Sequence, residues 1–212
     1  KGIITRVATH IRTLDYFTYG GFNGGNLVIL AARPSVGKTT IAMQIAQAAS
    51  ADNNKTLVFS LEMTKKELVQ RLLQSTGLVS QYELVTHKIN WDNYEKALGM
   101  VVNSNLIIND DAYNIHDIRH KIITSVKMQG VKMVLIDYLQ LMKGANPRMS
   151  KNDQVGELTS ALKQTAKQCN IPIIVLSQLS RESVRENRSP QLYDLRDSGS
   201  IEQDADIIMM LY

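Results

Sequence analysis

Residues 27–39 read LVILAARPSVGKT, an apolar run that leads into a loop ending in Gly-Lys-Thr. The loop matches the phosphate-binding pattern G-x-x-x-x-G-K-[ST], except that Ala32 stands where the first glycine is expected. Between a strand and a helix, such a loop wraps backbone N–H groups and the positive end of a helix dipole around an anion. An ordinary strand–turn–helix is the alternative, but the surrounding pattern favours a phosphate loop.

The residue types in this loop fit the chemistry of a nucleoside triphosphate bound together with magnesium. Gly37 permits a close turn, Lys38 reaches the β- and γ-phosphates, and the hydroxyl of Thr39 is a magnesium ligand. The methyl group of Ala32 must fit where the pattern has bare backbone. We therefore expect nucleotide contacts from one continuous segment, which is Arg33, Pro34, Ser35, Val36, Gly37, Lys38, Thr39 and Thr40.

Outside the loop, short β-rich apolar runs alternate with longer stretches of helical periodicity. This alternation is typical of a parallel sheet with crossover helices, and nearly continuous apolar strands indicate helices on both faces. The expected fold is one α/β domain over residues 1–212, with a mostly parallel, twisted sheet. Strands are expected at 27–32, 56–60, 106–109, 133–137, 171–177 and 207–211, and helices from 37, from 64, and at 91–103, 116–128 and 153–168.

Three further polar residues lie at the ends of predicted strands, where α/β sheets place their ligands. Asp137 ends an apolar strand in the manner of a Walker B carboxylate, which would hold magnesium together with Thr39. Glu62 follows the strand at 56–60, where it could be a catalytic base or could equally favour the dipole of the next helix. Gln178 could sense the γ-phosphate, but spacing alone favours a solvated strand end.

The composition excludes several classes of protein. With 212 residues and 44% hydrophobic content, the chain can bury a core without staples, and its single cysteine, Cys169, rules out an internal disulfide. One cysteine suits a reducing cytoplasm, and no run approaches the ~20 apolar residues of a membrane span. The net charge of +4 is compatible with nucleic acid. Because the chain begins at Lys1 and ends on an apolar run, we expect a fragment of a longer protein.

Beyond the phosphate loop, the chain carries further motifs, which are TLD at 13–15, GG at 20–21, FSLEM at 59–63, IDYLQLM at 136–142, LSQLSR at 176–181 and DLRDSGSIEQDAD at 194–206. With them, nearly the whole chain resembles the ATPase domain of the bacterial and phage replicative DNA helicases, the DnaB family. The alanine at position 32 is that family's own form of the loop. The family commonly has Arg-Glu-Ser-Gly where this chain has Arg-Asp-Ser-Gly at 196–199, which keeps the charge and shortens its reach.

The resemblance implies a RecA-like core that hydrolyses ATP with Mg²⁺ and works as a homo-hexameric ring around one DNA strand, moving 5′ to 3′. It implies that Glu62 is the catalytic base and that Gln178 couples the γ-phosphate to DNA-facing loops. Primase and a helicase loader are the implied partners of the full-length protein. The family's arginine finger is expected beyond the last strand and is not assigned. The expected catalytic set is Lys38, Glu62, Asp137 and Gln178.

The resemblance also implies that the polar stretches 143–152 and 180–194 face the central channel of the ring. Their cations suit a DNA phosphate backbone, although acidic residues partly cancel the charge of the second stretch and solvated surface loops are the alternative. The family pattern points most directly to the segment at 196–199. The expected contacts to single-stranded DNA are Arg148, Arg185, Arg188, Arg196, Asp197 and Gly199.

The expected function is the ATP-driven motor of a replicative helicase that unwinds duplex at the replication fork. Two alternatives would share the same core. One is a strand-exchange filament of the RecA kind, in which ATP mainly controls assembly, and electron microscopy would show open helices instead of closed rings. The other is an ATP-gated DNA adaptor or loader, which would show DNA-stimulated ATP hydrolysis without strand displacement.

Overall fold

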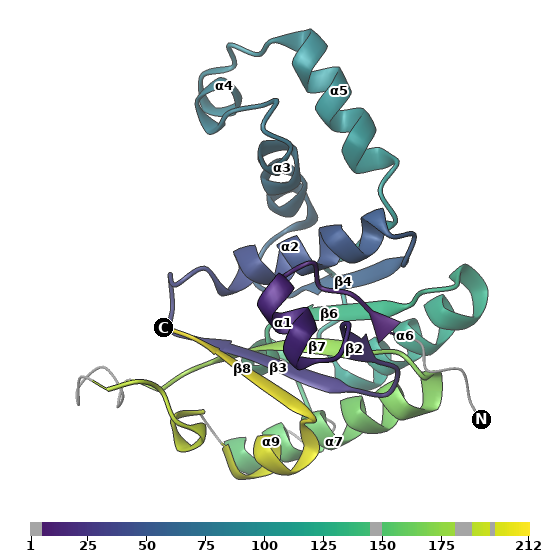
Figure 1. Ribbon diagram of the computed structural model, residues 1–212, viewed down its shortest axis with the longest axis vertical. Helices are drawn as coiled ribbons and strands as arrows, with labels where there is room; N and C mark the ends of the chain where they lie inside the picture. Colours follow the sequence, from purple (N-terminus) through teal and green to yellow (C-terminus); the bar gives the residue numbers. More distant parts are fainter. Residues whose placement is uncertain (1–5, 145–149, 181–187, 196–197) are drawn as a thin grey trace.

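The computed structural model describes residues 6–144, 150–180, 188–195 and 198–212, and its centre is a six-stranded sheet (Figure 1). Neighbouring strands are parallel at every pairing, in the order β5-β4-β6-β7-β3-β8. The expected α/β class is therefore confirmed. The strands are β3 (Leu27–Ala32), β4 (Thr56–Ser60), β5 (Leu106–Asn109), β6 (Met133–Asp137), β7 (Ile173–Gln178) and β8 (Ile207–Leu211).

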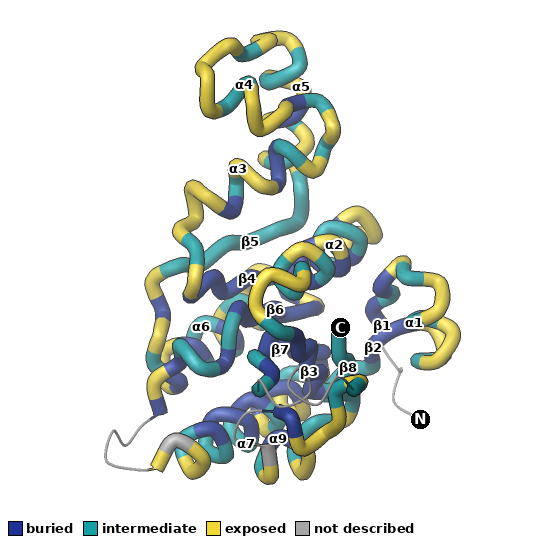
Figure 2. Tube along the Cα trace, turned by 90° about the vertical axis from the view of Figure 1, so that its left-hand side faces the viewer, coloured by how far each residue is buried: buried dark blue, intermediate teal, exposed yellow. Residues whose placement is uncertain are grey.

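The inner strands are apolar along their whole length because both of their faces are covered. Every residue of β3, β4 and β6 is buried, whereas the edge strands β5 and β8 are half-buried throughout (Figure 2). Along β3, Leu27, Ile29 and Ala31 join one hydrophobic cluster, and Val28 and Leu30 join another. The alternation places one cluster on each face of the sheet.

Helices cover both faces, as the sequence predicts. On one face lie α2 (Lys38–Ala51) and α3 (Lys65–Ser75), and on the other lie α6 (Ile115–Gln129), α7 (Lys151–Cys169) and α9 (Ser198–Asp204) (Figure 1). Apolar residues at helical spacing face the sheet, and burying each large one contributes about 1.5–3 kcal/mol. They include Ile45, Leu68, Ile118, Leu158 and Leu162.

The helices α3, α4 (Gln81–Thr86) and α5 (Trp91–Val102) form an arm that projects from the sheet (Figure 1). The arm has a small core of its own, made of Leu73, Val79 and Ala97. Helix α4 was not expected from the sequence, because it has six residues and none of them is buried. It begins with a capping box in which the hydroxyl of Ser80 accepts from the backbone N–H of Glu83.

Before the sheet, β1 (Arg6–Val7) and β2 (Phe22–Asn23) form a short antiparallel pair, with α1 (Arg12–Phe17) between them. These elements were also not expected, since two-residue strands leave no periodic signal. The carboxylate of Asp15 fixes this segment by accepting from the backbone N–H groups of Thr9 and His10 at 2.8 and 2.9 Å. The TLD motif at 13–15 therefore has a local structural role here.

Strand β7 begins at Ile173, two residues later than predicted, because the preceding residues close helix α7. Asn170 adopts a left-handed conformation, and the N–H of Ile171 bonds back to the carbonyl of Ala166 at 3.2 Å. The strand still ends at the sheet edge where β3 and β6 end, at Gln178. None of the helices in the described ranges has the length and apolar character that crossing a membrane requires.

Candidate nucleotide-binding site

The phosphate loop joins the carboxyl end of β3 to the start of α2. Ala32 is still a strand residue, paired with Gln178 and Leu211, so its methyl group packs in the core and needs no glycine. Gly37 stands at the N-cap of α2 with φ 101°, a left-handed conformation that favours glycine. Because no side chain caps this helix in the described structure, its first N–H groups remain available to an anion.

The phosphate loop and β6 meet through a side-chain hydrogen bond. The hydroxyl of Thr39 donates to Oδ2 of Asp137 at 2.7 Å, across 98 residues of sequence. Asp137 is 5% exposed, and its Oδ1 is buried with no donor among the described residues. Burial raises the pKa of Asp137, while Thr39 and Lys38 act in the opposite direction. A carboxylate with a free buried oxygen beside a threonine hydroxyl is the donor set that Mg²⁺ prefers.

Lys38 projects from the start of α2 toward the same carboxylate. Its Nζ lies 4.4 Å from the ring centroid of Tyr138, the residue that follows Asp137. Partial burial lowers the pKa of Lys38, and the charges of Asp137 and Glu62 partly restore it. A half-buried ammonium that lies over an aromatic face and feels the charge of two acids is placed to bind a phosphate group.

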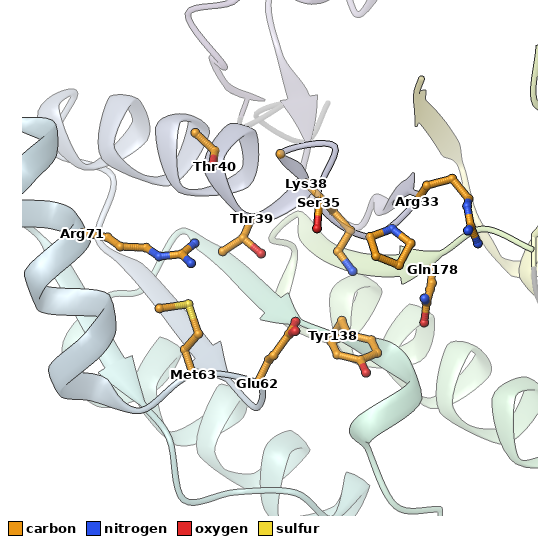
Figure 3. A pocket seen from close by; sticks show the side chains of 12 residues that line it. Arg33, Ser35, Lys38, Thr39, Thr40, Glu62, Met63, Arg71, Tyr138 and Gln178 are labelled. Atoms are coloured by element: carbon orange, nitrogen blue, oxygen red, sulfur yellow. The ribbon is translucent and has the colours of Figure 1, made fainter. Parts of the chain in front are cut away.

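Lys38, Thr39 and Tyr138 line a cavity of about 420 Å³ at the carboxyl edge of the sheet. Figure 3 shows Glu62 across the cavity from the phosphate loop, with Lys38 and Thr39 above it and Gln178 to one side. Glu62 is exposed, and Gln178 is half-buried. The wall is formed by Arg33, Pro34, Ser35, Gly37, Lys38, Thr39, Thr40, Glu62, Met63, Arg71, Tyr138 and Gln178.

The structure thus brings together the residues that the sequence assigns to nucleotide, metal and catalysis. Asp137 is not part of the cavity wall formed by the described residues, and its hydrogen bond to Thr39 connects it to the site. Two loop residues differ from the rest, one in its position and the other in its bonding. Val36 is 44% exposed and is not part of the wall that the described residues form. Arg33 belongs to the wall, and its Nη1 donates to the backbone carbonyl of Leu179 at 3.3 Å, so its guanidinium already has a protein partner.

The residues assigned to DNA are placed only in part. Arg188 is bonded twice to Asp194, at 2.5 and 2.9 Å, and its guanidinium lies 4.8 Å from the ring centroid of Tyr193. Gly199 is exposed on α9, with open space where a side chain would begin. The other four lie outside the described residues, and they are Arg148, Arg185, Arg196 and Asp197.

Sequence reasoning missed three residues of the cavity wall. Arg71 comes from the middle of α3, and Figure 3 shows its guanidinium pointing toward Thr39. Met63 and Tyr138 directly follow Glu62 and Asp137. The adjacency of these two to predicted site residues was a usable signal. For Arg71 the signal was weaker, since only the packing of α3 shows which face of the helix meets the cavity.

A parallel sheet, a glycine-containing loop that opens a helix, and a carboxylate contacting the loop's threonine define a phosphate-loop nucleotide-binding domain. Comparison with known proteins identifies the group within that class. Residues 6–212 match the family model described as the DnaB-like helicase C terminal domain. The chain therefore belongs to the DnaB-like helicase C-terminal domain family.

Individual relatives agree with this assignment. The chain is 40% identical to the "Replicative DNA helicase DnaB" of Geobacillus stearothermophilus and to the "Replicative DNA helicase DnaC" of Bacillus subtilis (strain 168). Both alignments cover 100% of this chain and 48% of the relative. The "Replicative DNA helicase DnaB" of Helicobacter pylori (strain ATCC 700392 / 26695) is 37% identical, over 99% of this chain and 44% of the relative. The chain thus spans about half the length of the curated relatives it matches.

Solved structures show the same fold. The chain superposes with a TM-score of 0.91 and 37% identity on a solved structure described as an "ATPase Domain", covering 100% of this chain and 78% of that one. The TM-score and the identity are the same for "The Structure Of A DnaB-Like Replicative Helicase And Its Interactions With Primase", of which 52% is covered. The RecA-like fold expected from the sequence is confirmed.

Proposed function

We propose that this domain binds ATP with Mg²⁺, hydrolyses it, and uses the energy to move 5′ to 3′ along single-stranded DNA and unwind duplex at the replication fork. The observation that carries the proposal is the contact between Thr39 and Asp137, beside Lys38 and facing Glu62 across one cavity. Membership of the DnaB-like family and relatives named replicative DNA helicases support the DNA-unwinding part.

Each residue has a role that follows from its position. Backbone N–H groups of the phosphate loop and the Nζ of Lys38 bind the phosphates. Thr39 and Asp137 would hold Mg²⁺, which when bound neutralises charge on the phosphate oxygens. Glu62 orients a water molecule for attack and accepts its proton. Gln178, at the far side of the cavity, senses whether a γ-phosphate is present.

The proposed contacts to DNA would form in the assembled protein. A homo-hexameric ring would place the polar stretches 143–152 and 180–194, and the segment at 196–199, along its channel, where cations contact the phosphates of one strand. Six copies of a weak contact give useful avidity. A neighbouring subunit would supply the arginine that completes the site. Primase and a helicase loader would bind the full-length protein in the cytoplasm, and one solved structure with the same fold is described together with its interactions with primase.

Replacing Glu62 by glutamine tests the catalytic assignment. The amide still fills the space but cannot accept a proton, so we expect nucleotide binding to persist and ATP hydrolysis to fall by roughly 100-fold or more. Glu95→Gln is the matched control, because Glu95 is an exposed glutamate on the arm. Near-normal turnover in Glu62→Gln would refute the assignment. Open filaments in place of closed rings, seen by electron microscopy with Mg²⁺ and ATP, would favour the strand-exchange alternative.

A further inference from the structure

We propose that Gln140 is a positioning residue, which holds Gln178 in the orientation that recognises the γ-phosphate. The inference rests on the proposed function, because it takes Gln178 to be the γ-phosphate sensor. Gln140 lies in the 3-10 turn η1 (Leu139–Leu141), three residues after Asp137. It is half-buried and is not part of the cavity wall formed by the described residues, so it acts through a neighbour.

That neighbour is reached by one directed hydrogen bond. Nε2 of Gln140 donates to Oγ of Ser177 at 3.0 Å, and Ser177 is fully buried in β7 immediately before Gln178. The strands β6 and β7 are adjacent and paired up to Ile136 and Val175. Beyond that pairing, the Gln140–Ser177 bond ties the end of the strand that carries Asp137 to the end of the strand that carries Gln178.

Stability alone does not explain an amide at this position. Oε1 of Gln140 is buried and has no donor among the described residues. Leaving a buried carbonyl unpaired is unfavourable, and an apolar side chain of similar size would fill the same space without that cost. What an apolar side chain cannot supply is the directed bond to Ser177.

Leu179, the residue that follows Gln178 in the chain, is held by hydrogen bonds as well. The N–H of Leu179 donates to the carbonyl of Ala32 at 3.0 Å, and the carbonyl of Leu179 accepts from Arg33 at 3.3 Å. Figure 3 shows Gln178 beside Arg33 and across the cavity from Arg71. Both neighbours of Gln178 are therefore fixed, one to the turn after Asp137 and the other to the phosphate loop.

Gln140→Met tests the inference. Dissociation constants for ADP and for a non-hydrolysable ATP analogue, each with Mg²⁺, are measured by calorimetry on the unsubstituted chain and on the variant. We expect the preference for the triphosphate to fall roughly tenfold, which is about the effect of losing one hydrogen bond from Gln178 to the charged γ-phosphate. The affinity for ADP and the temperature of thermal unfolding should change little. A merely structural role would weaken both nucleotides or lower the unfolding temperature.

Gln47→Met is the matched control, because Nε2 of Gln47 donates to Oγ of Ser75 at 2.7 Å in the same kind of pair outside this cavity. It should leave the preference unchanged. Gln178→Ala should lose the preference, and the double variant Gln140→Met/Gln178→Ala should lose no more than Gln178→Ala alone, because the two residues act as one unit. Ser177→Ala removes the other partner and should reproduce the loss if Gln140→Met does not fold.

Each outcome decides one point. If Gln178→Ala loses the preference but Gln140→Met and Ser177→Ala keep it, the inference is wrong and the proposed function stands. Additive losses in the double variant would also overturn the inference, since Gln140 would then act independently of Gln178. If Gln178→Ala keeps the preference, the sensor role of Gln178 fails and the inference fails with it. If the unsubstituted chain binds neither nucleotide, the proposed function itself fails.

Discussion

Two carboxylates, one at each end of the central sheet, differ in how fully their oxygens are hydrogen-bonded. At the carboxyl end, Asp137 accepts one hydrogen bond, from Thr39, and its second oxygen is buried without a donor among the described residues. At the amino end, Asp206 accepts from the backbone N–H of Leu27 at 2.7 Å and from Nζ of Lys163 with both oxygens, at 2.5 and 2.7 Å. Both ends belong to the same scaffold, since Leu27 begins β3 and the phosphate loop follows its last residue.

The difference separates a ligand site from a structural site. A buried carboxylate with a missing partner is unfavourable for folding and gains its partner when a cation binds. A carboxylate whose oxygens are all bonded contributes to the fold and has little capacity left for a ligand. Burial accordingly raises the pKa of Asp137, so its charge is less favourable in the folded chain than in the unfolded one.

Asp137→Asn is expected to have the largest effect on activity and almost none on folding. A neutral amide holds Mg²⁺ poorly, so ATP hydrolysis should fall by roughly 100-fold. Because the pKa of Asp137 is raised in the folded chain, its contribution to stability is present below the ordinary pKa and lost as the pH rises through the raised value. At pH 7 without Mg²⁺, the variant should therefore be as stable as the original or more stable, by about 1 kcal/mol.

Urea unfolding with and without Mg²⁺, combined with an ATPase assay, checks this expectation. Mg²⁺ with a nucleotide should stabilise the original chain and have much less effect on the variant, since a ligand stabilises only the state that binds it. A loss of several kcal/mol in the metal-free variant would show that Asp137 is a structural residue like Asp206, and the contrast between the two ends of the sheet would disappear.

Asp206→Asn should show the reverse pattern, with a clear loss of stability. Lys163 would lose its ion pair while 16% of its side chain is exposed, and we expect the free energy of unfolding to fall by about 2 kcal/mol. Nucleotide affinity per folded molecule should change little. In the double variant Lys163→Met/Asp206→Asn, part of the loss should be recovered because no charge is left unpaired. A fall in nucleotide affinity without a loss of stability would place Asp206 in the ligand site.

The sequence predicts the sheet well because burial on both faces makes the inner strands nearly unbroken apolar runs, and the half-buried edge strands are apolar as well. All six predicted strands exist, and their bounds agree within two residues. The elements that were missed are short, and the two helices among them, α1 and α4, are largely exposed. Neither α1 nor α4 buries a residue, so neither has the apolar stripe that periodicity detects. The capping box at Ser80 and Glu83 was a local signal that could have revealed α4.

The candidate site was predictable to different degrees. The phosphate loop and Asp137 follow from pattern and chemistry, because spacing along the chain dictates their geometry. Spacing left Glu62 open and argued against Gln178, and their roles came only from the family resemblance, whereas the structure brings both to one cavity wall. The Gln140–Ser177 bond could not be predicted, since it depends on the relative positions of two strand ends that 37 residues separate.

Asp194→Asn is expected to have the smallest effect on stability. The pH dependence of this effect tests whether Asp194 is a structural carboxylate, as Asp206 is. Asp194 is fully buried, and Arg188 lowers the pKa of Asp194 through a direct hydrogen bond, with further help from the backbone N–H of Gln191. A lowered pKa means that the stabilisation is fully present above the ordinary value of ~3.9 and is lost as the pH falls through the lowered one. The original chain should therefore exceed Asp194→Asn in stability by about 1 kcal/mol at pH 7, and this difference should shrink below about pH 4.

Arg188→Met should reduce the pH dependence of the difference, because the guanidinium is its main cause. A difference that stayed constant from pH 7 to pH 3 would mean that the ion pair between Arg188 and Asp194 contributes nothing to folding, and Asp194 would then not be a structural carboxylate of the Asp206 kind.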